Sequence, residues 1–246
     1  AHLPQHWKHS APTGNFFGRL DSVSPSVIEG GIEIAVYRDS SDTWSHNIAS
    51  YSEEKLGSFV PSKREMEEDG PVRSTVRVEG QYGRSTVYAW FRIYKDHPAA
   101  ELEMRINWNE EFSIAKLCIP FNPIGKREDG VPGGSLNRPL DSKEYPFRDW
   151  IKITGENADS TAAVITPDCY GVDVSDQMIR LSILRSPPFA WHYPFDLQEN
   201  YPYRITDQGE HIIRFAFTLD RSASELDTLA KFMHSPPRIF DWTRGM

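Results

Sequence analysis

Asp207, Glu210 and His211 lie in the short run D-Q-G-E-H, which places two carboxylates beside an imidazole. General acid–base catalysis uses this combination of side chains, provided that they share one cleft. The same run also fits a polar turn that Gly209 ties to a following strand. The spacing allows both interpretations, so these three residues are candidates for a site and not an assignment.

Arg185 closes the apolar run L-S-I-L-R and comes just before the pair Pro187-Pro188. An arginine at the end of a strand, beside a loop, is well placed to hydrogen-bond a hydroxylated ligand or a carboxylate. A structural ion pair would use the same guanidinium group. Arg185 is therefore a second candidate, with both roles open.

Residues 133–150, GGSLNRPLDSKEYPFRDW, combine glycine and proline with aromatic residues and charges of both signs. This composition predicts a long loop, and long loops in compact domains are usually functional or disordered. Arg138, Asp141 and Tyr145 are its candidates for contact with a ligand or a neighbouring domain. We expect the loop to be exposed and comparatively mobile.

Motifs for self-contained catalysis are absent from the sequence. It contains no G-x-S-x-G elbow, no cysteine–histidine signature, no phosphate-binding loop and no H-E-x-x-H metal motif. Glycosidases use two carboxylates roughly 5–10 Å apart, a distance that a sequence cannot measure. We therefore assign no catalytic and no metal-ligating residue.

Strands must position these candidates, and the clearest ones lie between residues 75 and 121. Apolar and polar residues alternate with period two, and Gly83-Arg84 fits a two-residue hairpin turn. We predict an antiparallel meander of four strands, the last carrying Ile119 and Phe121. Tyr88 and Trp90 fall on its mixed face. This face could be a carbohydrate platform, but we favour the interpretation that a second sheet covers it.

The rest of the chain is also predicted to consist mainly of strands and loops. We predict a strand at 162–168, a hairpin over 171–186, an aromatic, proline-rich loop at 187–204, a strand through 211–219 and one helix. That helix starts at a capping box made by Ser222 and Glu225. The expected fold is all-β, a large antiparallel sandwich with one C-terminal helix. Residues 1–18 are predicted to be a loosely packed lead-in, and 19–246 a single domain.

Composition limits the partners. The chain has 246 residues and a net charge of −8, which argues against nucleic acid or an anionic membrane as the main partner. No apolar run reaches the roughly 18 residues that a membrane-spanning helix needs. Cys118 and Cys169 form neither a disulfide framework nor a zinc motif, which favours a reducing compartment, and we expect a cytoplasmic location. Cys118 fits a small buried core residue.

Several stretches taken together resemble the C-terminal β region of glycoside hydrolase family 38, the α-mannosidases. They are GSLNRPLDSKEYPFRDWIKI, then AAVITPDCYGVDVSDQMIRLSILRSP, then DQGEHIIRFAFT, with the upstream SDTWSH and EDGPVRSTVRVEGQYGRSTVYAWFRIYKDHPAAELEMRINWNEE. The likeness covers roughly residues 30–220. The stretch SPPRIFDWTRGM after the helix matches nothing in that pattern.

This resemblance implies a sandwich of the galactose-mutarotase-like type within a longer retaining α-mannosidase. In the family, an N-terminal barrel holds the catalytic metal, usually zinc, together with the nucleophile and the acid/base carboxylate. No residue here matches those groups, so we expect this region to need no cofactor and to be inactive alone. The implied partners are α-mannosides and the barrel. The candidates at the barrel's rim, or at the contact between domains, are Arg138, Asp141, Tyr145, Arg185, Asp207, Glu210 and His211.

Two other functions stay open at this point. The aromatic rows could make the chain a stand-alone carbohydrate-binding module. The implied fold, with His192 and His211, also allows an aldose mutarotase or epimerase, which would need a histidine and a carboxylate in one cleft. The oligomeric state is left open by the sequence.

Overall fold

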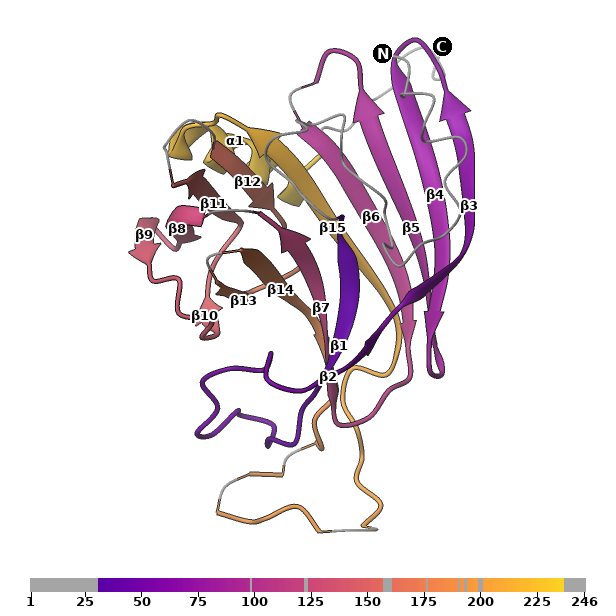
Figure 1. Cartoon of the computed structure of the whole chain (residues 1–246), viewed down its shortest axis with the longest axis vertical. Coiled ribbons are helices and arrows are strands. Elements are labelled where there is room, and N and C mark those ends of the chain that lie inside the picture. The colour runs from indigo at the N-terminus through magenta and orange to yellow at the C-terminus, as the bar shows by residue number, and fades with distance from the viewer. Residues whose placement is uncertain are drawn as a thin grey trace, which may run out of the picture.

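The computed structural model describes residues 31–97, 99–121, 124–156, 161–175, 177–189, 191–192, 194–198 and 201–236. Within these residues the chain forms two antiparallel sheets and one helix (Figure 1). The six-stranded sheet has the order β10 (Tyr145–Pro146), β13 (Gly171–Val174), β14 (Met178–Arg185), β7 (Ser113–Pro120), β1 (Glu33–Arg38), β2 (Lys55–Ser58). The nine-stranded sheet has the order β3 (Val60–Asp69), β4 (Arg73–Tyr82), β5 (Ser85–Tyr94), β6 (Ala99–Trp108), β15 (Gly209–Leu219), β12 (Thr161–Ile165), β11 (Trp150–Gly155), β8 (Ile124–Val131), β9 (Gly134–Arg138).

The period-two alternation of residues 75–108 produces three neighbouring strands, as predicted. Along β4, β5 and β6 the apolar side chains point to one face and are buried, and the charged ones point to the other. Gly83 has a φ of +51° and lets Tyr82 pair directly with Ser85 across a two-residue turn. The hydrophobic pattern therefore fixes both the strands and their register.

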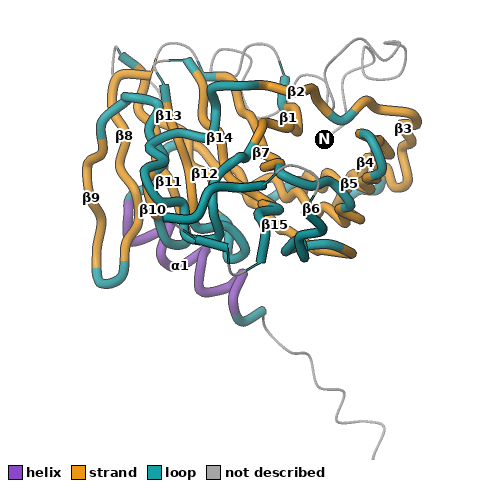
Figure 2. Tube along the Cα trace, turned by 90° about the horizontal axis from the view of Figure 1, so that it is seen from below, coloured by secondary structure: helices purple, strands orange, loops and turns teal. Residues whose placement is uncertain are grey.

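One hydrophobic core joins the two sheets. Leu117 and Leu181 of the six-stranded sheet pack in the same cluster as Met104, Ile151 and Phe215 of the nine-stranded sheet, and all five are buried. Figure 2 shows β1, β7, β13 and β14 of the six-stranded sheet on one side of β12 and β15 and the helix on the other. The predicted all-β antiparallel sandwich with one C-terminal helix is confirmed.

The predicted four-strand meander is wrong in its last strand. Strand β7 leaves the meander and pairs with β1 and β14 at the centre of the other sheet. Seven of its eight residues are buried. A strand covered on both faces belongs inside a sandwich, and not at the half-exposed end of a meander.

Helix α1 (Ala223–His234) starts where the capping box predicted. The Ser222 side chain accepts a hydrogen bond from the Glu225 amide, and Glu225 bonds back to the Ser222 amide. Its apolar stripe, with Leu226 and Ala230, packs on the outer face of the nine-stranded sheet around Ile165. The helix thus covers that face over β11, β12 and β15 and reaches Ala99 at the start of β6.

The expectation that residues 133–150 form an irregular loop holds for 139–144 and 147–149 and is wrong for the rest of the segment. The segment folds into β9, which pairs with β8, and β10, which pairs with β13. Strand β9 faces solvent, whereas Phe147 and Trp150 are buried. Strand β9 forms a hairpin with the preceding β8 across a two-residue turn, whereas β10 pairs with a strand about 25 residues further along the chain, a pairing that the sequence does not display.

Other predictions concern single residues and the chain ends. Cys118 is buried, as predicted, and burial raises the pKa of its thiol to about 11. Cys169 is also a buried free thiol. Among the described residues no helix has the length and apolar character to span a membrane. The predicted lead-in at 1–18 and the residues from 237 onward lie outside the described part of the chain.

Candidate functional site at the loop end of the sandwich

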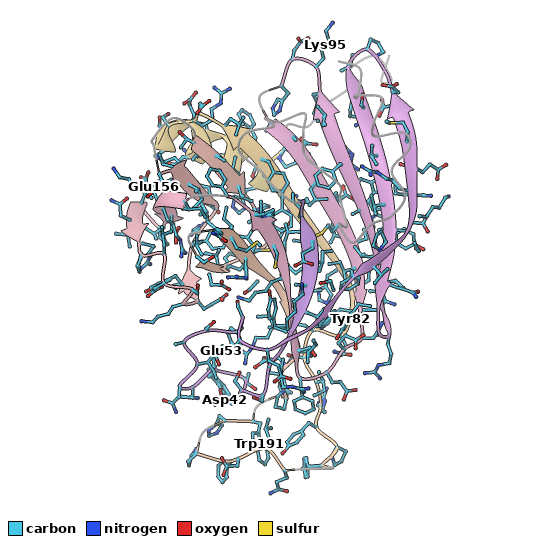
Figure 3. All side chains as sticks on the ribbon, viewed as in Figure 1. Asp42, Glu53, Tyr82, Lys95, Glu156 and Trp191 are labelled. Carbon is cyan, nitrogen blue, oxygen red and sulfur yellow. The ribbon has the colours of Figure 1, made fainter. Side chains whose placement is uncertain are left out.

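Two loops meet at one end of the sandwich, and we call residues 39–54 and 186–208 the loop end. Strand register brings them together, because Arg38 pairs with Ser113 and Arg185 pairs with Ile114 at the ends of their strands. The Thr43 amide then donates to the Trp191 carbonyl over 3.1 Å. Figure 3 shows Asp42 and Trp191 at this same end.

Arg185 fastens the two loops to each other. Its Nε donates to Asp39 Oδ2 at 2.6 Å, and Nη2 donates to Ser41 Oγ at 2.6 Å. It also donates to the main-chain carbonyls of Asp42, at 2.5 Å, and Thr43, at 3.1 Å. Because Asp39 is almost completely buried, this is a structural ion pair that also shapes the loop. The guanidinium lies behind the loop surface, with its side chain 19% exposed.

Aromatic side chains form the outer part of the loop end. The Trp191 ring lies 5.0 Å from that of Tyr203 and 6.0 Å from that of Phe195, and Trp44 packs edge-on against His192 at 5.5 Å. The predicted aromatic, proline-rich loop is thus packed on its own rings. Four large side chains still face solvent, each more than half exposed: Trp44, Phe189, Phe195 and Tyr201. Exposed aromatic clusters of this kind mark interaction surfaces.

The run D-Q-G-E-H does not form an acid–base pair. Asp207 has a φ of +54° and offers its main-chain carbonyl, not its carboxylate, to His211 Nε2 at 2.9 Å. Glu210 and His211 are consecutive residues of β15, so their side chains point to opposite faces of the sheet. The geometry matches the alternative that the sequence left open, a polar turn tied down through Gly209, whose φ is +109°.

The remaining candidates lie together at the β9–β10 edge. Tyr145 donates its hydroxyl to Asp141 Oδ2 at 3.1 Å, and the Arg138 guanidinium lies 5.2 Å from the Tyr145 ring centre. Desolvation acts to raise the pKa of Asp141, but hydrogen bonds from the Lys143 amide and Tyr145 outweigh it, so this pKa lies below its usual value. This group is separate from the Arg185 cluster.

A buried charge network that the sequence analysis missed connects the two groups. Lys116, fully buried in β7, places its ammonium 2.5 Å from Glu144 and 2.6 Å from Asp173. The Glu144 amide donates to the Ala49 carbonyl, which ties the β9–β10 segment to the loop end. Ser52, Arg180 and Ser182 complete the hydrogen bonds of the two carboxylates. The available signal was a lysine inside the apolar run I-A-K-L-C-I, because a buried lysine requires a partner.

The row with Tyr88 and Trp90 lies on the outer face of the nine-stranded sheet. The favoured interpretation, cover by a second sheet, is wrong, since that sheet packs on the opposite face around Ala89. Tyr88 is 44% exposed, but Arg105 lies over the Trp90 ring at 5.4 Å and takes the surface that a sugar would need. The row is therefore a weaker candidate surface than the loop end.

The described residues offer no group of three or more His, Cys, Asp or Glu side chains that could hold a metal ion. The groups that the loop end presents are suited to aromatic stacking, hydrogen bonding and steric shape.

Comparison with known proteins relates the chain to a family of glycosyl hydrolases. The family model described as the glycosyl hydrolases family 38 C-terminal domain matches residues 20–193. No curated protein matches the chain in sequence.

Solved structures match the fold. The structure of a glycosyl hydrolase family 38 protein from Enterococcus faecalis has a TM-score of 0.63 at 12% identity, over 83% of this chain and 28% of that one. An α-mannosidase from Enterococcus faecalis V583 gives 0.63 and 12%, over 83% and 27%. A protein assigned as an aldose 1-epimerase from Klebsiella pneumoniae gives 0.40 and 7%, over 72% and 57%. The chain thus spans little more than a quarter of the two Enterococcus proteins.

Proposed function

The chain belongs to the glycosyl hydrolases family 38 C-terminal domain family, and we propose that it is the C-terminal β-sandwich of a retaining α-mannosidase. The observation that carries the proposal is the family match over residues 20–193, more than two thirds of the chain. The shared fold with the two Enterococcus structures supports it.

In this proposal the bond-breaking groups lie outside these 246 residues. As the resemblance implies, a barrel earlier in the longer enzyme supplies the zinc, the aspartate nucleophile and the acid/base carboxylate. The substrates are α-mannosides and the enzyme serves mannose metabolism, with a cytoplasmic location. The sandwich alone is inactive, because it brings substrate surface and not reacting groups.

In this proposal the loop end is the part of the sandwich that contacts the substrate or the barrel. Its exposed aromatic side chains, among them Trp44 and Phe195, lie over the rim of the barrel's sugar pocket or against the barrel wall. Rings at such a place exclude water and stack on the C–H faces of a mannose residue. Arg185 lies behind this surface and fixes the loop that carries Trp44 by donating hydrogen bonds to its main-chain carbonyls.

The first experiment measures the chain by itself. Purified chain is incubated with an aryl α-mannoside, and release of the aryl group is followed against a buffer blank. We expect release at the spontaneous rate. Turnover at the rate of a typical enzyme would place the reacting groups inside this chain and refute the proposed division of labour.

The second experiment uses the longer enzyme encoded by the parent reading frame. Trp44→Ala and Phe195→Ala are compared with Tyr88→Ala, a similarly exposed aromatic on the outer sheet face. We expect the first two to lower kcat/KM for α-mannosides about tenfold, which corresponds to about 1.4 kcal/mol of transition-state binding, and the third to leave it unchanged. Equal kinetics for all three would remove the loop end from the rim.

The exposed aromatic cluster also favours a second candidate, a stand-alone carbohydrate-binding module. This candidate predicts that the chain alone binds mannose or short mannans. Calorimetric titration at millimolar sugar separates the two functions, since only a module gives saturable heat without the barrel. Loss of that heat in Phe195→Ala would locate the binding at the loop end.

A further inference from the structure

Two arginines face each other across the β8–β9 hairpin. Arg127 and Arg138 are directly paired in the strand register. Arg127, only 1% exposed, forms a bidentate bond to Asp129, with Nε–Oδ1 at 2.8 Å and Nη2–Oδ2 at 2.6 Å. Arg138 Nε lies 4.0 Å from the same carboxylate, beyond hydrogen-bonding distance. Two cations therefore share one buried anion.

Each arginine keeps a donor without an acceptor. Arg127 Nη1 and Arg138 Nε are shielded from solvent and have no hydrogen-bond partner among the described residues. Both guanidinium groups lie over the Tyr145 ring, at 5.4 and 5.2 Å, and the face of a ring does not satisfy an N–H as an oxygen would. Leaving a buried donor unpaired is unfavourable, so two on paired residues indicate a missing acceptor.

A cavity lies beside Arg138, the outer arginine of the pair. Its volume is about 530 Å³, within the range of small-molecule sites, and Arg138, Arg148 and His234 line it. Its carboxylate, Asp149, is already engaged by His234 at 2.7 Å and by Arg148 at 3.5 Å. The rest of the lining is largely apolar: Val131, Pro132, Pro146, Phe147 and Tyr170. We call it the hairpin cavity.

The local charge is opposite to that of the molecule. Arg138 and Arg148 line the cavity together with one carboxylate, Asp149, so its lining carries an excess of one positive charge even with His234 neutral. The whole chain carries −8. A cationic spot on an acidic protein favours an anionic ligand.

We propose that the hairpin cavity binds a small molecule through an oxyanion, a carboxylate or phosphate group such as an acidic or phosphorylated sugar carries. The planar guanidinium fork matches two oxygens of such a group, whereas a neutral hexose would leave the excess charge uncompensated. The site is built wholly from residues of this chain. It therefore stands independently of the proposed function.

Calorimetric titration of the chain tests the site. Sodium phosphate, sodium glucuronate and neutral mannose are compared at constant ionic strength, with Arg138→Gln and the control Arg105→Gln, an arginine on the outer sheet face with a 52% exposed side chain. We expect saturable binding of phosphate or glucuronate, weakened at least tenfold in Arg138→Gln and unchanged in Arg105→Gln. Preference for one anion identifies the group, and either preference supports the site.

Three results would overturn it: no saturable binding of either anion, equal binding by Arg138→Gln, or mannose binding as tightly as the anions. A second measurement covers the case in which Arg138→Gln fails to fold. Nitrogen-15 NMR of the arginine Nε–Hε groups in the unaltered chain should show the Arg138 signal shifting with phosphate or glucuronate, while that of Arg105 stays in place. An Arg138 signal unmoved by both anions would also refute the site.

Discussion

At the scale of single residues, buried charges in this sandwich hold loops in place. Arg185 and Lys116 each lie in a strand, and each binds carboxylates or carbonyls that belong to a different part of the chain. Such pairs contribute little when compared with apolar packing, yet breaking one leaves an uncompensated buried charge. Their effect is therefore positional, since they determine where the aromatic side chains of the loop end stand.

Arg185→Ala should destabilise the chain by about 3 kcal/mol, because it strands the buried Asp39 carboxylate. Urea unfolding measures the loss. As a matched control, Arg84→Ala removes an exposed pair with Glu111 and should cost under about 0.5 kcal/mol.

Kinetics in the longer enzyme separate the two roles of Arg185. Asp39→Asn is added to Arg185→Ala to restore stability. If kcat/KM is still lowered in this double variant, Arg185 belongs to the rim. Unchanged kinetics with lower stability would assign it to packing alone.

At the scale of elements, the β8–β9 hairpin and helix α1 depend on short local features. Gly130 permits the close approach of residues 148–150, which a Cβ would obstruct. The capping box at Ser222 and Glu225 starts the helix that covers part of the outer face. Each feature depends on one or two residues. Gly130 acts on a segment about 20 residues away, whereas the capping box acts within a single turn of helix.

Gly130→Ala should lower the free energy of unfolding by about 2 kcal/mol through overpacking. The new Cβ would lie 2.5 Å from the Arg148 carbonyl oxygen and 3.0 Å from the Trp150 ring, neither of which can easily move. Gly134→Ala on the same hairpin is the control, because its Cβ would meet nothing within 4 Å. Equal stability of the two variants in urea unfolding would contradict the packing derived for this hairpin.

Glu225 should make the helix sensitive to acid. Hydrogen bonds from the Ser222 amide and hydroxyl, with Arg221 nearby, lower the pKa of its carboxyl from 4.5 to about 2. A pKa depressed in the folded state adds stability above the unfolded value, and that stability is lost as pH falls through the folded value. The stability advantage of the unaltered chain over Glu225→Gln should therefore shrink between pH 4.5 and about 2. A difference that stays constant with pH would disprove this linkage.

At the scale of the whole molecule, the two sheets share one hydrophobic core. Residues from both sheets enter a single core cluster, and the strands cross repeatedly from one sheet to the other along the chain. A shared core and interleaved strands give no natural point of division. We propose that residues 19–246 form one domain, as the sequence analysis expected.

Met104→Ala tests this unity. Met104 is completely buried in the shared core, and its truncation should cost about 3 kcal/mol. Far-ultraviolet circular dichroism and tryptophan fluorescence should shift together to lower urea, because one cooperative unit unfolds. Met66→Ala, on the exposed edge strand β3, serves as the control and should leave both transitions in place. Separate transitions for the two probes would indicate two units.

The sequence by itself determined what depends on near neighbours. Period-two alternation predicts β4, β5 and β6, Gly83 permits their tight turn, and Ser222 with Glu225 predicts the start of α1. These features can be predicted because side-chain direction, turn geometry and capping act within a few residues. The ordered motifs likewise indicated the family that the match over residues 20–193 shows.

Only the tertiary structure decided what depends on segments far apart. It moved β7 into the other sheet, paired β10 with β13, and separated Glu210 from His211 on opposite faces of β15. It also paired Lys116 with Asp173, and Arg185 with Asp39 across 146 positions of sequence. The physical reason is that sheet pairing and buried charge obey distance in space, which a linear pattern does not contain.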